Sequence, residues 1–169
     1  MPGACDTRRL RATYLPLVAL ALGAALVACG RRAAPLPCRE DPARTRRLLG
    51  SLGALGDRRV PTAPRGLRVC FDGAPGISGD YTVRLDPSWE DRALAARLGH
   101  LLVHTRDGVA REEPPRDGRC EPWVSSMMAR EREARGLEAS LRGRLGLVPA
   151  PPDDALDLES AYRARCVGR

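Results

Sequence analysis

The spacing of apolar residues along the chain predicts four helices. The first follows Asp41 and places Pro42 at its first helical position, and its leucines recur at helical spacing until Gly56. Proline at the start and glycine just past the end are typical of a helix. Three later stretches keep the same period. The expected helices cover residues 42–55, 89–104, 122–145 and 154–166.

Two short stretches between the first and second helices alternate apolar and polar positions instead. In "GLRVCFDG" the apolar positions are Leu67, Val69 and Phe71, and in "YTVRLD" they are Tyr81, Val83 and Leu85. The glycine-rich "GAPGISGD" between them favours an antiparallel hairpin. The predicted fold class is α+β, with a small antiparallel β-hairpin or sheet packed on two long helices and short additional helices at the N- and C-terminal ends.

The N-terminal segment has a pattern of its own. Basic residues in 7–11 precede an apolar run over 15–27, which is short for a membrane span and typical of a secretory signal. Residues 30–37, "GRRAAPLP", look like a linker. We therefore divide the chain into a signal peptide over 1–28, a tether over 29–38 and one domain over 39–169.

The signal ends in "LVAC", which resembles the lipobox of bacterial lipoproteins. The resemblance implies that Cys29 carries the lipid and becomes the mature N-terminus, so that the protein is held on a membrane surface. Gly30 stands where an aspartate would retain a lipoprotein in the inner membrane, which favours the outer membrane. An uncleaved anchor, or an ordinary signal cut elsewhere, is the alternative.

Four cysteines remain in the expected domain: Cys38, Cys70, Cys120 and Cys166. An even number in an exported domain predicts two disulfides, for which three connectivities are open. We expect Cys38 to pair with Cys70 and Cys120 with Cys166, because each bond would tie a terminal segment to the middle of the domain.

The charge of the chain bears mainly on its partners. The formal net charge is +7, every basic residue is arginine, and aromatic residues make up 4% of the chain. No stripe of arginines is interleaved with aromatic residues for stacking, so nucleic-acid binding is not expected. A basic surface suits anionic headgroups or polymers, so the expected partners are the membrane and an envelope protein or polymer.

The expected helix over 89–104 carries the candidate chemistry. It contains "HLLVH", in which His100 and His104 stand four residues apart and therefore on one side of the helix. Two imidazole nitrogens placed in this way can bind one metal ion. The pattern shares its spacing with HExxH, in which the glutamate after the first histidine is the general base.

Strands, a histidine helix, a loop and a second long helix together resemble the core of zincin metallopeptidases over residues 65–147. The segment "EREARGLEASL" is similar to the ExxA[ND] segment of the gluzincin type. The resemblance implies zinc as cofactor, Glu131 as third ligand and Ala134 in the alanine place, with Arg135 where Asp or Asn is usual. Glu131 also lies on the apolar stripe of its own helix.

Two departures from the family pattern, Leu101 and Arg135, argue against catalysis. Leu101 stands where the general base should be and cannot accept a proton, so we assign no catalytic residue. Asp107, three residues after His104, could support that histidine but is poorly placed as a base. Without metal, both histidines would be hydrogen-bonded core residues and the protein would have no cofactor.

The function expected from sequence is that of a non-catalytic, lipid-anchored envelope protein with a degenerate zincin-like site. A zinc hydrolase with unusual chemistry and a metal-binding lipoprotein are the alternatives. The first would use His100, His104 and Glu131 with an open fourth position, and the second would use the same ligands without turnover.

Overall fold

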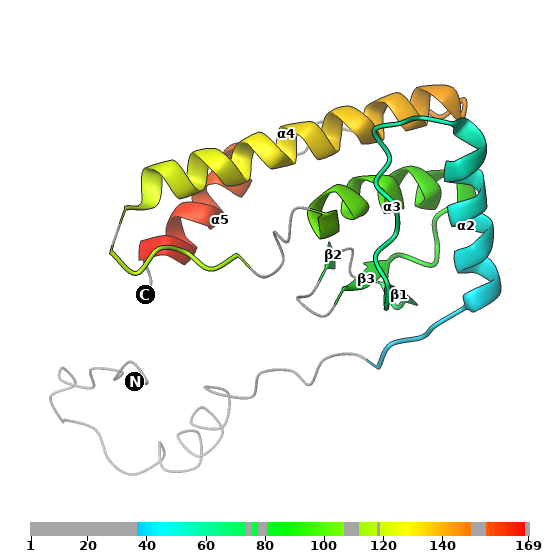
Figure 1. Ribbon diagram of the computed structural model, residues 1–169, viewed down its shortest axis with the longest axis horizontal. Coiled ribbons are helices and arrows are strands. Elements are labelled where there is room, and N and C mark those ends of the chain that lie inside the picture. The colour runs from blue at the N-terminus through cyan, green and yellow to red at the C-terminus, as the bar shows by residue number, and fades with distance from the viewer. Residues whose placement is uncertain are drawn as a thin grey trace, which may run out of the picture. The chain divides into compact units, whose positions relative to one another are not determined.

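The computed structural model describes residues 37–73, 76–77, 81–106, 112–117, 119–149 and 155–167. The folded unit that contains them runs from Pro37 to Arg169 (Figure 1). The expected signal peptide, the expected lipidation site Cys29 and the polar residue Asp107 lie outside the described residues. Within the described part of the chain, no helix is both long enough and apolar enough to cross a membrane.

The four predicted helices are present. They are α2 (Pro42–Leu55), α3 (Asp91–Arg106), α4 (Cys120–Arg144) and α5 (Ala155–Val167). The ends of α2 follow the sequence signals, since the Asp41 side chain accepts a hydrogen bond from the Arg44 backbone N–H at 2.8 Å. At its other end Gly56 adopts a left-handed conformation with φ 59°. The predicted fold class, α+β with a small sheet, is confirmed.

The pairing of the strands differs from the predicted hairpin. The strands β1 (Arg68–Phe71), β2 (Gly76–Ile77) and β3 (Thr82–Leu85) form a mixed sheet in the order β1-β3-β2. β1 and β3, the two strands expected to be antiparallel, run parallel, while the short β2 is antiparallel to β3. The antiparallel hairpin was therefore wrong. Because β2 is antiparallel to β3, and β3 is parallel to β1, the chain reverses direction between β1 and β2 and again between β2 and β3.

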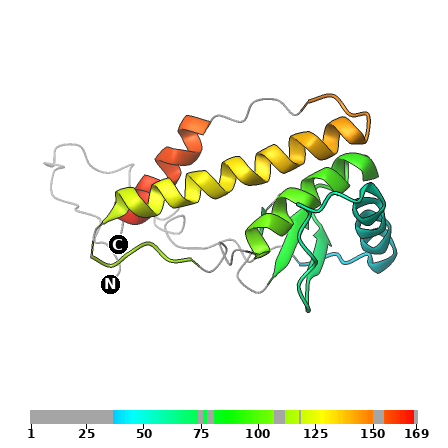
Figure 2. The ribbon, with the colours of Figure 1, turned by 45° about the horizontal axis from the view of Figure 1, so that its top comes forward.

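The main core surrounds α3, which packs against α4, α2 and the strands β2 and β3. Figures 1 and 2 both show α3 running alongside α4, with the sheet on the other side of α3 and α2 across one end. Residues on every side of α3 are buried, since every residue from Leu98 to Thr105 is buried over more than two turns. The helix that carries both histidines is therefore held from several directions.

A second, smaller core lies between the first half of α4 and α5. It contains Trp123, Val124, Met127 and Cys166, with Tyr162 packed against it. The rings of Trp123 and Tyr162 meet edge to face at 5.7 Å between centroids. This cluster attaches α5 to α4 independently of the main core.

Both expected disulfides are present, and their pairing is the one predicted. Cys38 is bonded to Cys70, which fixes the segment before α2 to β1. Cys120 is bonded to Cys166, which joins the start of α4 to the end of α5. The bonds close loops over sequence separations of 32 and 46 residues, for which loop entropy gives a stabilisation of about 4 kcal/mol each.

Candidate metal centre

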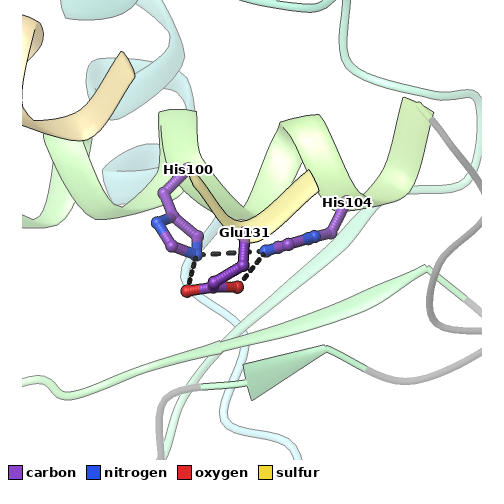
Figure 3. Close-up of side chains that lie close together, drawn as sticks. All are labelled: His100, His104 and Glu131. Carbon is purple, nitrogen blue, oxygen red and sulfur yellow. Dashed lines mark hydrogen bonds and ion pairs between the residues drawn. The ribbon is translucent and has the colours of Figure 1, made fainter. Parts of the chain in front are cut away.

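The two histidines of α3 face each other across one turn of the helix. His100 and His104 are both buried, with 2% and 6% of their surface exposed. Their Nε2 atoms lie 3.1 Å apart. Figure 3 shows the two rings turned toward a common point on the side of α3 that faces α4. The spacing of four residues thus has the consequence predicted from sequence.

Glu131 of α4 completes the group. Its carboxylate lies between the two rings (Figure 3), with Oε1 3.6 Å from His100 Nε2 and Oε2 3.1 Å from His104 Nε2. The residue is 8% exposed, because it stands on the stripe of α4 that also buries Met127 and Ala134. The structure therefore brings together the three residues that the zincin resemblance proposed as ligands.

The spacing of these atoms fits a small divalent ion. One ligand atom from each residue can be chosen so that all lie within 4.8 Å of one another. Zinc binds His N at about 2.0–2.1 Å in a tetrahedron, which places its ligand atoms about 3.3 Å from each other. The two Nε2 atoms are 3.1 Å apart, and His104 Nε2 is 3.1 Å from Glu131 Oε2, both within a few tenths of an ångström of that value. The other carboxylate oxygen, Oε1, is 3.6 Å from His100 Nε2. This buried group could hold a metal ion.

Two charged residues of α4 and one of α3 surround the group. Glu138 Oε2 lies 3.0 Å from His100 Nδ1 and also 3.0 Å from Arg97 Nη1. Arg135 Nε donates to Glu131 Oε1 at 2.8 Å. Arg135 therefore neutralises part of the charge on the carboxylate that would bind a metal.

The electrostatic environment keeps both buried carboxylates ionised. Burial raises the pKa of Glu131, but hydrogen bonds from His104 and Arg135 and the charges of the two imidazoles outweigh it and lower this pKa from 4.5 to about 2. Burial also raises the pKa of Glu138. The contacts with His100 and Arg97 outweigh this effect, so the pKa of Glu138 is lowered overall. An ionised carboxylate is the form that binds a metal ion.

Leu101 is not directed at the ligand group. It is 3% exposed and belongs to the main hydrophobic core. The position that would hold the general base of a hydrolase is thus filled by a side chain that packs in the core. No other residue is seen to take over this role among the described contacts of the site.

Some features of the site lie beyond the sequence prediction. Glu138 is buried on the same helix as Glu131, but the sequence did not indicate its contacts with His100 and Arg97. The signal was present, since Arg97 precedes His100 by three residues and Glu138 follows Glu131 by two helical turns. His104 Nδ1 is buried without a hydrogen-bond partner among the described residues, and the partner expected for it, Asp107, lies outside them.

No protein-family model, curated protein or solved structure matches this chain. The chemical interpretation therefore depends on the geometry of the three residues. Two imidazoles and one carboxylate can bind a divalent ion and leave a fourth coordination position for another ligand. The zincin family stays a hypothesis taken from the sequence.

Proposed function

We propose that this chain is an exported bacterial lipoprotein that binds zinc at His100, His104 and Glu131 and does not hydrolyse peptides. The convergence of three buried ligand atoms from two helices carries the proposal. Buried polar groups of this kind need partners, and a divalent ion would satisfy all three at once. When bound, zinc would supply a Lewis acid and a cross-link between α3 and α4.

The absence of catalysis follows from the residue beside the first histidine. Water bound to zinc needs a nearby group to accept its proton, and Leu101 has none. Arg135, which pairs with Glu131, is a cation and cannot act as a base at neutral pH. A site that retains its ligands without a base is suited to binding and not to hydrolysis.

The proposed location follows from the N-terminal sequence and the disulfides. The lipobox-like "LVAC" places a lipid on Cys29, and Gly30 favours the outer membrane. Two disulfides join four of the remaining cysteines, which is typical of proteins in oxidising compartments. We infer that the domain works at the envelope surface, with an envelope protein or polymer as partner.

The test is the metal content of the purified, oxidised full chain, measured by elemental mass spectrometry after zinc is added and excess removed. We expect about one zinc ion per chain, and loss of that zinc in His100→Ala and in Glu131→Ala. Glu133→Ala is the matched control, because Glu133 is exposed on the same helix and pairs with Arg106 outside the ligand group. It should retain the zinc.

The same preparations separate the proposal from its alternatives. A wild-type chain that stays folded and binds no zinc contradicts metal binding. Cleavage of unstructured peptides by wild type, lost in His100→Ala, would instead favour a hydrolase, for which the open fourth coordination position is the supporting observation. Zinc binding without cleavage is the result we expect.

A further inference from the structure

Glu138 stands where it can act on the proposed metal site without touching the metal. It lies two helical turns after Glu131 on the buried stripe of α4 and is 6% exposed. Its Oε2 is 3.0 Å from Nδ1 of His100, the ring nitrogen that faces away from the ligand group. The two atoms are at hydrogen-bonding distance, but the ring as it stands does not make the hydrogen bond, because the Nδ1–H direction is not aligned with the oxygen. Rotation of the imidazole would bring the two into line.

Arg97 holds the same carboxylate from the other helix. Its Nη1 lies 3.0 Å from Glu138 Oε2, and its side chain is largely buried. Arg97 precedes His100 by three residues on α3, so both side chains approach Glu138 from one face of that helix. A buried carboxylate needs such a cation, because an unpaired charge in the interior is costly.

A neutral imidazole carries one proton, on either Nδ1 or Nε2. A carboxylate beside Nδ1 favours the proton there, which leaves the lone pair on Nε2. In His100 that Nε2 is the atom that lies close to Glu131 and His104. With its proton on Nδ1, His100 would present the Nε2 lone pair to the position that a metal ion would occupy.

We propose that Glu138, held by Arg97, is the positioning residue that fixes the tautomer and orientation of His100; this inference rests on the proposed metal binding. Arg135, one turn after Glu131, cannot take this role because it has no acceptor atom and its Nε is directed to Glu131. Contacts of this type raise metal affinity by making the ligand basic and by holding its ring in place.

The test uses the full chain labelled with ¹⁵N-histidine. The sequence contains two histidines, so long-range ¹H–¹⁵N spectra hold two imidazole patterns, which His104→Gln assigns. We expect His100 of the wild type to carry its proton on Nδ1. Glu138→Leu should abolish that preference and weaken zinc binding by about 10- to 100-fold, measured by competition with a chelating dye.

Two further variants define the cause. Glu138→Gln retains a carbonyl oxygen that can accept from Nδ1, so its loss of zinc affinity should be smaller than that of Glu138→Leu. Glu133→Leu removes an exposed carboxylate from the same helix and should leave both the tautomer and the affinity of wild type.

The inference is overturned if wild-type His100 carries its proton on Nε2, or if Glu138→Leu leaves tautomer and affinity unchanged. Its failure is distinguishable from failure of metal binding. A wild-type chain that binds no zinc, but whose His100 tautomer responds to Glu138→Leu, supports the positioning contact and contradicts the proposed function. The tautomer of His100 can be measured without metal. The measurement therefore tests the role of Glu138 whether or not the chain binds zinc.

Discussion

Leu101, an aliphatic residue, directly follows His100, the first of the two histidines. Leu101 is one residue from His100 and yet packs with the main core, whereas His100 faces α4 and Glu131. If a glutamate replaced Leu101, its carboxylate would be buried in the hydrophobic core unless the side chain turned toward His100 and Glu131. The character of position 101 therefore has a direct experimental consequence.

Replacement of this leucine should show which way the position faces. Leu101→Glu should lower the free energy of unfolding by about 3 kcal/mol or more, because a carboxylate would be buried without a partner. Leu101→Met, which conserves volume, should cost less than about 1.5 kcal/mol. Urea unfolding of the three proteins gives these values. If Leu101→Glu is as stable as Leu101→Met and gains peptide hydrolysis, position 101 faces the ligands and our assignment is wrong.

At this scale the sequence predicted the residues better than their contacts. His100 and His104 were found because spacing on a helix determines which side chains share a face. Glu131 came from the resemblance to the gluzincin segment, with support from its place on the apolar stripe of its helix. The contacts of Glu138 with His100 and Arg97 were not, because they depend on how α3 and α4 are rotated and shifted against each other. Sequence periodicity identifies a buried face, and only the packed pair of helices shows which residues on two such faces meet.

At the scale of helices and strands, the sequence predicted which elements form but not how the strands pair. All four helices were predicted, because caps and apolar periods are local signals. The pairing of β1 with β3 was not, since alternation identifies a strand but carries no information about the direction of its neighbour. The two-residue strand β2 is too short to show a period, and it is the element that allows β3 to run parallel to β1.

The close approach of α3 to α4 depends on Gly99. A Cβ atom built there would lie 2.5 Å from Cδ1 of Leu141, a fully buried side chain of α4. Gly99→Ala should therefore destabilise the protein by about 1 kcal/mol or more, even though alanine favours the helix by about 1 kcal/mol. Gly136 is an exposed glycine of α4 with no atom within 4 Å of such a Cβ, so Gly136→Ala should stabilise by about 0.5–1 kcal/mol.

The opposite signs of these two changes make the comparison informative. Thermal unfolding of both variants shows whether each alanine raises or lowers the stability relative to wild type. In a Leu141→Ala background the cost of Gly99→Ala should shrink, because the clashing atom has gone. Equal stabilisation by both alanines would mean that the two helices do not touch at Gly99.

At the scale of the whole molecule, two disulfides and a set of ionised carboxylates both contribute to the stability of the fold. One disulfide fixes each end of the domain. Arginines form ion pairs with many of the acidic groups. All carboxyl pKa shifts resolved among the described residues are downward. They belong to Asp57, Asp86, Asp91, Asp117, Glu121, Glu131 and Glu138. Such shifts link the stability of the fold to pH.

Asp57 is the clearest case outside the metal site. Its Oδ1 accepts from the backbone N–H and from Nε of Arg59, both at 3.0 Å, and its Oδ2 lies 3.7 Å from Arg144 Nη1 on α4. The side-chain and backbone hydrogen bonds from Arg59 lower the pKa of Asp57 from 3.8 to about 2. Asp57 thereby links the loop after α2 to the end of α4.

The direction of the pH effect follows from this shift. A carboxyl that binds its proton more weakly in the folded state stabilises the fold at pH values above its unfolded pKa, and this stabilisation is lost as the pH falls through the folded pKa. The free energy of unfolding should therefore change little from neutral pH to about pH 5 and then decrease toward about pH 2. Asp57→Asn should be less stable at neutral pH and show a shallower decrease between about pH 4 and about pH 2.

Urea unfolding of the oxidised chain across this pH range measures both effects. Glu133→Gln is a suitable comparison, because it removes an acidic group from an exposed pair with Arg106 that joins only the surfaces of α3 and α4. If Asp57→Asn and wild type lose stability in parallel as the pH falls, Asp57 does not contribute to acid sensitivity. The contact between Asp57 and Arg144 of α4 would then not contribute measurably to the free energy of unfolding.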